Sequence, residues 1–182
     1  FFRARHSAHR QSDTWDRLGF ALHVTLTSIQ KVWREQKADH VVFCFEGRSW
    51  RKDFYEPYKK NRSVARASLT EAELEEDRLF WEAFDNLKTF IFENSNCTAL
   101  QHNELEADDL IAGWIQNHTD DEHIIVSSDT DFYQLLSNNV KQYNGITDEL
   151  HTLEGIFDKK GDPVLDKKTK EPKVVFLSNK YF

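Results

Sequence analysis

The sequence predicts an α/β fold with a mainly parallel central sheet that is flanked by helices. Three short runs, 41–45, 97–101 and 123–128, have the length and the apolar character of strands, and segments with helical periodicity lie between them. The first run, Val41-Val42-Phe43-Cys44-Phe45, is apolar throughout, as expected for a parallel strand that is covered on both faces. Acidic residues follow each of the three runs.

The composition is that of one soluble domain, or slightly more than one. The chain has 182 residues, 39% of them apolar, with 14 Phe and 5 Trp, which is enough for a core. Its net charge of -7 does not by itself indicate a nucleic-acid partner. No run of 18 apolar residues is present, so we expect no membrane span and a cytoplasmic location. Cys44 and Cys97 lie in strand-like segments and are expected to be buried thiols rather than a disulfide.

The N-terminal part of the chain predicts a basic arm and a long helix. Phe1 to Arg10 is a basic segment, expected to be solvated or to meet phosphate. A helix is predicted from Asp13 to about Glu35, and Gly19 within it indicates close packing against a neighbour. The apolar stripe of this helix comprises Leu18, Leu22, Leu26, Ile29 and Trp33.

The segment that follows the first strand, Arg48 to Arg66, is the most polarised part of the chain. Its seven basic residues are interleaved with aromatic ones; the set is Arg48, Trp50, Arg51, Lys52, Phe54, Tyr55, Tyr58, Lys59, Lys60, Arg62 and Arg66. Positive charge suits phosphates and flat rings suit stacking of bases, as on a single-stranded nucleic-acid path. The alternative is a solvated basic loop whose aromatic residues turn into the core.

The remaining elements are a second long helix, further strands and a surface excursion. Ser68 with Glu71 predicts a capping box for a helix that continues to about Phe92. Its apolar stripe comprises Phe80, Phe84, Leu87 and Ile91, and its acidic outer face is expected to be solvated. Residues 140–143 predict an edge strand, and 153–173 a hairpin-like excursion. The expected organisation is a core over 1–150 and a C-terminal segment over 151–182.

The first acidic cluster, Glu104-Leu105-Glu106-Ala107-Asp108-Asp109, lies in the first turn of an amphipathic helix. The apolar face of that helix comprises Ala107, Leu110, Ile111, Trp114 and Ile115. Asn103 and Glu106 could be an N-cap and its reciprocal partner, and a helix N-terminus favours acids. That interpretation leaves three carboxylates crowded within four residues, where repulsion costs stability unless a cation is bound.

The second cluster, Asp129-Thr130-Asp131, follows the carboxyl end of the strand at 123–128, the end at which open α/β sheets bind ligands. Two carboxylates on one side of a turn suit a hard cation. Alternatively, Asp129 caps the next short helix and Asp131 is a first-turn acid. Glu46 is a third acid at a strand end, and the agreement of the three positions favours a metal site.

These strand-end sites together resemble the phage and bacterial 5′-nuclease family of flap endonucleases and 5′–3′ exonucleases, and the phage members most. The matching motifs are Phe45-Glu46-Gly47 with Trp50-Arg51, Tyr58-Lys59-Lys60-Asn61-Arg62, Leu105-Glu106-Ala107-Asp108-Asp109-Leu110, and Ser127-Ser128-Asp129-Thr130-Asp131 with Gln134-Leu135. Their order and spacing agree over 1–143. The resemblance implies a PIN-like core that uses two divalent ions, Mg²⁺ or Mn²⁺.

The resemblance also assigns roles to residues. Lys59 and Arg62 would hold the scissile phosphate, and Arg3 matches the basic residue after the family's first strand. The metal ligands would be Glu46, Glu106, Asp108, Asp109, Asp129 and Asp131. Of these, Asp109 would either bind a metal directly or stand next to the ligands. Nucleic acid would be contacted by Arg48, Trp50, Arg51, Lys52, Tyr58, Lys60 and Arg66.

The sequence departs from the family pattern at three places. The family's first strand ends in an Asp shortly before the position of Arg3, and the chain starts after that point. Glu46 stands where the family usually has Asp, so a longer side chain would have to reach the metal. The family's later Asp cluster and its glycine-rich helix–three-turn–helix have no counterpart. Either residues 151–182 are the start of a missing or truncated DNA-binding part, or the protein binds duplex DNA differently.

The function implied is that of a metal-dependent 5′-nuclease that hydrolyses DNA at 5′ ends or flaps, in phage DNA replication or repair. Two Mg²⁺ ions about 3.5–4 Å apart activate water and neutralise the charge of the transition state. We expect a monomer without membrane partners, and an RNA–DNA hybrid is a second expected substrate. The alternatives are a Mg²⁺-dependent phosphatase with Asp129 as nucleophile and a non-catalytic nucleic-acid-binding module with incomplete metal sites.

Overall fold

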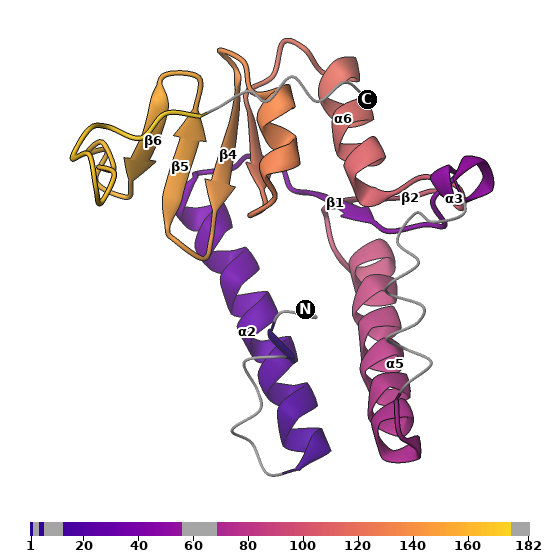
Figure 1. Ribbon diagram of the computed structural model, residues 1–182. Coiled ribbons are helices and arrows are strands. Elements are labelled where there is room, and N and C mark those ends of the chain that lie inside the picture. Colours follow the sequence, from indigo (N-terminus) through magenta and orange to yellow (C-terminus); the bar gives the residue numbers. More distant parts are fainter. Residues whose placement is uncertain (2–3, 6–12, 56–68, 176–182) are drawn as a thin grey trace. The chain divides into compact units, whose positions relative to one another are not determined.

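The computed structural model describes residues 1, 4–5, 13–55 and 69–175 (Figure 1). The chain divides into two compact units, Phe1–Ala107 and Asp108–Phe182. Both units contain helices and strands, which confirms the predicted α/β class. None of the helices in the described ranges combines the length and the apolar character that crossing a bilayer requires.

The elements that the structure describes in the first unit are two long helices, a short helix and a two-stranded parallel sheet. The long helices are α2 (Thr14–Glu35) and α5 (Glu71–Asn94), and the short helix is α3 (Arg51–Phe54). Strand β1 (Val42–Phe45) pairs in parallel with β2 (Thr98–Gln101), as predicted. Cys44 and Cys97 are both free and half-buried, and burial raises the pKa of the Cys44 thiol to about 11.

Helix α2 begins where the sequence predicts, but two residues of its predicted apolar stripe, Leu26 and Trp33, are 47 and 49% exposed among the described residues. Asp13 caps it, because the Asp13 carboxylate accepts a hydrogen bond of 3.1 Å from the backbone N–H of Trp15. Leu18 and Ala21 are buried against Phe80 of α5. The prediction for Gly19 was wrong: no described atom lies within 4 Å of the place where a Cβ would stand.

Helix α5 carries the capping box two residues later than predicted. Thr70 accepts a hydrogen bond of 3.3 Å from the N–H of Glu73, and the Glu73 carboxylate accepts one of 2.8 Å from the N–H of Thr70. Ser68 lies outside the described residues. The predicted apolar stripe is confirmed, since Phe80, Leu87 and Ile91 are buried and Phe45 of β1 packs with the last two.

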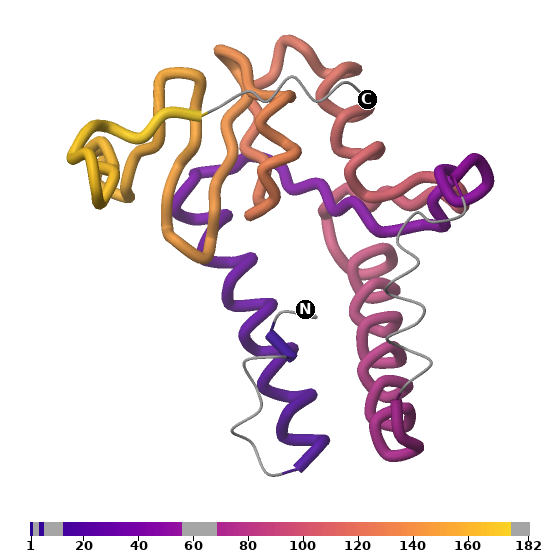
Figure 2. Tube along the Cα trace, in the orientation of Figure 1, coloured from indigo at the N-terminus to yellow at the C-terminus, as the bar shows by residue number. Residues whose placement is uncertain are grey.

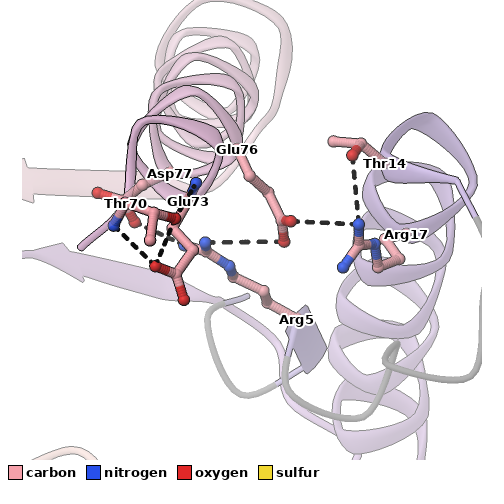
Figure 3. A network of polar contacts seen from close by, with 7 residues as sticks. All are labelled: Arg5, Thr14, Arg17, Thr70, Glu73, Glu76 and Asp77. Atoms are coloured by element: carbon pink, nitrogen blue, oxygen red, sulfur yellow. Dashed lines mark hydrogen bonds and ion pairs between the residues drawn. The ribbon is translucent and has the colours of Figure 1, made fainter.

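The acidic face of α5 is partly covered by ion pairs, contrary to the prediction that it is solvated (Figure 3). Arg5 contacts Asp77 at 2.6 Å and Glu76 at 3.8 Å, and Arg17 of α2 contacts Glu76 at 3.2 Å. The Arg5 guanidinium also lies 4.5 Å from the centre of the Phe80 ring. Arg5 is therefore part of the packing of this unit, whereas 6–10 of the basic arm lie outside the described residues.

The second unit is built on a mixed sheet with the strand order β3-β4-β5-β6. Helix α6 (Ala107–Asn117) leads into β3 (His123–Val126), which the 3-10 helix η2 (Thr130–Leu135) follows. The later strands are β4 (Val140–Asn144), β5 (Glu149–Thr152) and β6 (Gly155–Asp158). Figure 2 traces the chain from β4 through the hairpin of β5 and β6.

The prediction of an edge strand at 140–143 was wrong. Strand β4 pairs in parallel with β3 on one side and antiparallel with β5 on the other, so it lies inside the sheet. The reason is the β5–β6 hairpin, whose strands at 149–158 extend the sheet past residue 150. The parallel part of the sheet thus continues into an antiparallel part. The predicted division of the chain into a core over 1–150 and a C-terminal segment stays a prediction.

The hairpin brings a buried histidine into the sheet, and this predicts a pH effect on stability. His151 is 4% exposed; burial lowers its pKa, Lys173 lowers it further, and Glu149 opposes the shift. Tyr133 also faces its ring, with the hydroxyl 2.8 Å from Nδ1. Below the ordinary pKa of 6.5 the unfolded chain binds a proton at His151 that the folded chain does not, so the stability of the fold falls as the pH decreases through that value.

We expect the melting temperature to drop more between pH 7.5 and 5.5 in the wild type than in His151→Gln. Equal drops would contradict a contribution from His151.

Candidate functional site

The loops that follow β1 and β2 are joined by backbone hydrogen bonds. The N–H groups of Gly47, Arg48 and Trp50 donate to the carbonyl oxygens of Leu105, Asn103 and Glu104, at 3.0, 2.9 and 2.9 Å. Parallel strands end at the same edge of their sheet, so the two acidic loops meet there. This contact places Glu46 and Glu106 on one continuous backbone scaffold.

Gly47 allows the two loops to approach each other. A Cβ at this position would lie 1.8 Å from the His102 carbonyl oxygen and 2.6 Å from that of Leu105, both backbone atoms. We therefore expect Gly47→Ala to lower the free energy of unfolding by about 3 kcal/mol, the upper part of the usual range for overpacking. Urea unfolding measures this. The matched control is Gly19→Ala in α2, which has open space and should raise stability by about 0.5–1 kcal/mol. Equal small effects would contradict the close approach.

Glu46 acts on the start of α6. Its Oε2 accepts a hydrogen bond of 2.7 Å from the backbone N–H of Ala107, the first residue of that helix. A helix N-terminus has N–H groups without intrahelical partners, and its dipole favours a negative charge. The predicted cap of Asn103 with Glu106 was wrong, because the helix begins later and the carboxylate comes from the end of β1.

Glu106 is a buried carboxylate with a cationic partner. The residue is 5% exposed, and its Oε2 lies 3.2 Å from Nη1 of Arg51 in α3. The Arg51 guanidinium lies 4.9 Å from the centre of the Trp50 ring. The sequence pointed to Glu106 as a metal ligand and to Arg51 as a nucleic-acid contact, but it did not indicate that the two side chains meet.

The other four predicted metal ligands belong to the second unit. Asp108 and Asp109 lie in the first turn of α6, the former exposed and the latter half-buried. Asp129 and Asp131 are exposed at the end of β3, and Oδ1 of Asp129 accepts a hydrogen bond of 3.0 Å from the N–H of Asp131. The capping role of Asp129 is therefore confirmed. It does not exclude a cation, since a carboxylate has a second oxygen and further lone pairs.

The topology puts these four acids at one end of the second unit. Residues 118–122 join α6 to β3, and Ile111 and Ile115 of α6 pack against Ile125, Phe132 and Val140. A helix that packs on a strand through so short a connection runs antiparallel to it. The first turn of α6 therefore lies at the same end as the turn that follows β3.

The donors match a hard divalent ion in chemistry, because Mg²⁺ and Mn²⁺ prefer carboxylate oxygens. In the part of the chain that the structure describes, however, no three His, Cys, Asp or Glu side chains stand close enough to hold a metal ion.

The aromatic side chains in the described part of the basic and aromatic segment are exposed to solvent. Trp50, Phe54 and Tyr55 are 41, 83 and 62% exposed, so the alternative in which its aromatic residues turn into the core was wrong for them. The Trp50 and Phe54 rings meet edge to face at 5.7 Å. Lys52 is exposed, and Arg48 pairs with Asp53. Flat exposed rings beside cations are the surface that stacked bases and phosphates require.

Several predicted residues lie outside the described part of the chain, namely Arg3, Tyr58, Lys59, Lys60, Arg62 and Arg66. Sequence reasoning also missed Gln142, which is 1% exposed in the middle of β4. Its signal was a polar residue within a strand, which we assigned to a sheet edge.

Comparison with known proteins gives the family. Residues 1–161 match the model of the 5′-3′ exonuclease, N-terminal resolvase-like domain. DNA polymerase I of Rhizobium leguminosarum is 33% identical over 125 residues, which are 68% of this chain and 11% of that protein. Flap endonuclease Xni of Shewanella piezotolerans is 29% identical over 136 residues, 72% of this chain and 48% of that one.

Solved structures show the same fold. The 5′-exonuclease of T5 with bound zinc superposes with a TM-score of 0.68 at 22% identity, over 84% of this chain and 54% of that chain. A T5 flap endonuclease in complex with DNA and metal ions superposes with a TM-score of 0.61 at 24% identity, over the same shares. The predicted PIN-like core is thereby confirmed.

The chain spans about half the length of the flap endonuclease and of the T5 proteins that it matches, and about a tenth of the polymerase. The match of the family model nevertheless covers most of the sequence and includes the acidic motifs at the ends of β1 and β3 and at the start of α6. The chain belongs to the family of 5′–3′ exonuclease N-terminal resolvase-like domains.

Proposed function

We propose that the protein is a divalent-metal-dependent 5′-nuclease that hydrolyses DNA at 5′ ends or flaps. The observation that carries the proposal is the set of acids at the ends of β1 and β3 and in the first turn of α6, in a chain of this family. A T5 relative has been solved with DNA and metal ions, which supports both the substrate and the cofactor.

The metal in this proposal is Mg²⁺ or Mn²⁺, as two ions. Bound divalent ions would activate water and neutralise charge on the phosphate. The residues proposed to hold them are Glu46, Glu106, Asp108, Asp109, Asp129 and Asp131. Glu106 would have to exchange the Arg51 guanidinium for an ion, and Glu46 would share its carboxylate with the N–H of Ala107.

The substrate path in this proposal runs over the exposed face of 48–55. Trp50, Phe54 and Tyr55 offer rings for stacking, and Lys52 offers charge for a phosphate. Arg48, Tyr58, Lys60 and Arg66 would extend the path, and Arg3, Lys59 and Arg62 would act at the scissile phosphate. Basic residues gathered in one segment would allow a chain with a net charge of -7 to hold DNA.

The wider setting is also a proposal. We propose that the protein is a monomer that acts in DNA replication or repair in the cytoplasm, which would be the host cytoplasm if a phage encodes it. RNA–DNA hybrid is proposed as a second substrate. We further propose that 1–150 is the nuclease core and that 151–182 leads into a DNA-binding part.

One experiment tests the proposed activity. The protein is incubated with 5′-flap DNA, with single-stranded DNA and with a small phosphoester, each with Mg²⁺ and with EDTA. We expect the flap substrate to be cleaved in the presence of Mg²⁺ and to stay intact in EDTA. Cleavage of only the small phosphoester would favour a phosphatase instead.

A second candidate function is a non-catalytic nucleic-acid-binding module. The observation that favours it is the pairing of Glu106 with Arg51; in addition, no group of three possible metal ligands is found among the described residues. Binding of flap DNA without cleavage under any divalent ion would support this function and contradict the first.

Lys59→Ala separates a role in cleavage from a role in binding. If Lys59 holds the scissile phosphate, its loss should slow single-turnover cleavage by about 10²-fold, as for other preorganised electrostatic contacts, while DNA affinity changes little. Arg66→Ala is the matched control, because it removes a cation of the same segment; it should weaken binding and reduce its salt dependence. Lost binding with an intact single-turnover rate would assign Lys59 to attraction of the backbone.

A further inference from the structure

A buried polar group lies directly beneath the acidic turn that follows β3. Gln142 of β4 is 1% exposed, and its Nε2 donates hydrogen bonds to the carbonyl oxygens of Ser127 and Asp129, at 2.9 and 2.8 Å. Both acceptors are backbone atoms of the turn. Their position fixes the orientation of the side-chain amide, because the reverse orientation would set an oxygen against two carbonyl oxygens.

A second buried polar contact lies next to the first and reaches the same segment. His151 of β5 stands opposite Gln142 in the antiparallel register and is 4% exposed. Its Nδ1 lies 2.8 Å from the hydroxyl of Tyr133 in η2, and its Nε2 lies 3.5 Å from a carboxylate oxygen of Glu149. A ring that accepts from the Tyr133 hydroxyl through Nδ1 carries its proton on Nε2, and this Nε2 has no hydrogen-bond partner among the described residues.

We propose that Gln142, His151 and Tyr133 form a polar brace that positions Asp129 and Asp131 for metal binding. Gln142 holds the backbone at Asp129, and the His151–Tyr133 contact holds η2, which carries Asp131. The three are positioning residues, since none of them is itself proposed to touch the metal or the substrate. This inference rests on the proposed function and extends it to the support of the site.

Burial makes a packing role alone a poor explanation of these residues. Among the described residues, Oε1 of Gln142 has no hydrogen-bond partner, although its atom is buried, and such a group opposes folding. An apolar side chain in this strand would avoid that penalty but would leave the Ser127 and Asp129 carbonyls without a donor from β4. The brace therefore serves the conformation of the turn rather than the density of the core.

The brace would also hold two carboxylates in place that repel each other. Asp129 and Asp131 are exposed and repel each other, and the contact between them is a single hydrogen bond from a backbone N–H. Two carboxylates meet one ion only if the backbone that carries them is held in place. Partners that orient metal ligands from behind change metal affinity or activity by about 10- to 100-fold when they are mutated.

Gln142→Leu and Tyr133→Phe test the proposal in two independent ways. The first removes both hydrogen bonds to the turn, and the second removes one hydroxyl and keeps the ring, so it should fold even if the first does not. We measure the Mn²⁺ dependence of flap cleavage and direct Mn²⁺ binding by calorimetry. The half-saturating Mn²⁺ concentration should rise about 10- to 100-fold in Gln142→Leu and in the same direction in Tyr133→Phe, and excess metal should restore the rate.

Leu18→Ala is the matched control for lost stability. Leu18 is buried in α2 of the first unit and packs against Phe80, so its truncation leaves the brace residues unchanged. This variant should melt at a lower temperature in EDTA and keep the wild-type metal dependence. If both brace variants keep that dependence while the wild type cleaves with Mn²⁺, the brace is overturned and the nuclease function stands. A wild type that neither binds Mn²⁺ nor cleaves would overturn the proposed function itself.

Discussion

Asp129→Asn and Asp131→Asn should each reduce cleavage of a 5′-flap substrate by at least 10²-fold, as loss of a preorganised electrostatic contact typically does. Asn keeps the size of Asp and its ability to accept hydrogen bonds, but it lacks the negative charge that would hold a divalent ion. Single-turnover rates at saturating Mg²⁺ measure the effect. DNA binding in Ca²⁺ should survive, because the basic segment is unchanged.

The capping role of Asp129 makes this test discriminating. Its Oδ1 accepts the N–H of Asp131, and Asn at an N-cap is as favourable as Asp. Stability should therefore hold, or rise, because one of two repelling charges is removed. Asp158→Asn is the control, since Asp158 lies in the same unit and likewise accepts hydrogen bonds from the backbone N–H groups of Lys160 and Asp162. Near-wild-type cleavage by both site variants would leave capping as the only role of Asp129.

Elements whose pattern is local could be predicted from the sequence. The apolar spacing in α2 and α5 and the apolar runs of β1 and β3 depend on neighbours within a few residues, and these elements lie where we expected them. The start of α5 was ambiguous, because both Ser68 with Glu71 and Thr70 with Glu73 fit a capping box, and the structure uses the second.

Features that depend on distant partners could not be predicted. From its own residues, strand β4 is expected to be an edge strand, because nothing within 140–144 indicates that β5 pairs with it on its second side. Gly47 is needed because a backbone 55 or more residues later approaches it, whereas Gly19 has no such neighbour. The Glu46 cap likewise joins residues 61 positions apart. For the site, the acid-rich motifs were visible, but the partners of each acid were not.

Arg51→Met should separate the structural role of Glu106 from a metal-binding role. The substitution removes the guanidinium that faces a carboxylate whose side chain is 6% exposed. Loss of one partner of a buried ion pair lowers the free energy of unfolding by about 3 kcal/mol at the low end of the usual range. We expect this low value for Arg51→Met, because the Arg51 side chain is 26% exposed and therefore only partly removed from water. Urea unfolding in EDTA measures the loss.

Mn²⁺ should then restore part of the stability, because a cation can replace the guanidinium beside Glu106. Linkage gives about 2.7 kcal/mol when the ion is present at a hundredfold excess over its dissociation constant. If the ion and Arg51 compete for Glu106, the variant binds Mn²⁺ more tightly, and its melting temperature rises more with metal than that of the wild type. The control is Arg78→Met, which removes two exposed ion pairs of α5, with Glu75 and Glu82, and should leave the metal effect unchanged. A metal effect in Arg51→Met no larger than in the wild type would show that Glu106 serves the fold and that the ions are held by the aspartates of the second unit.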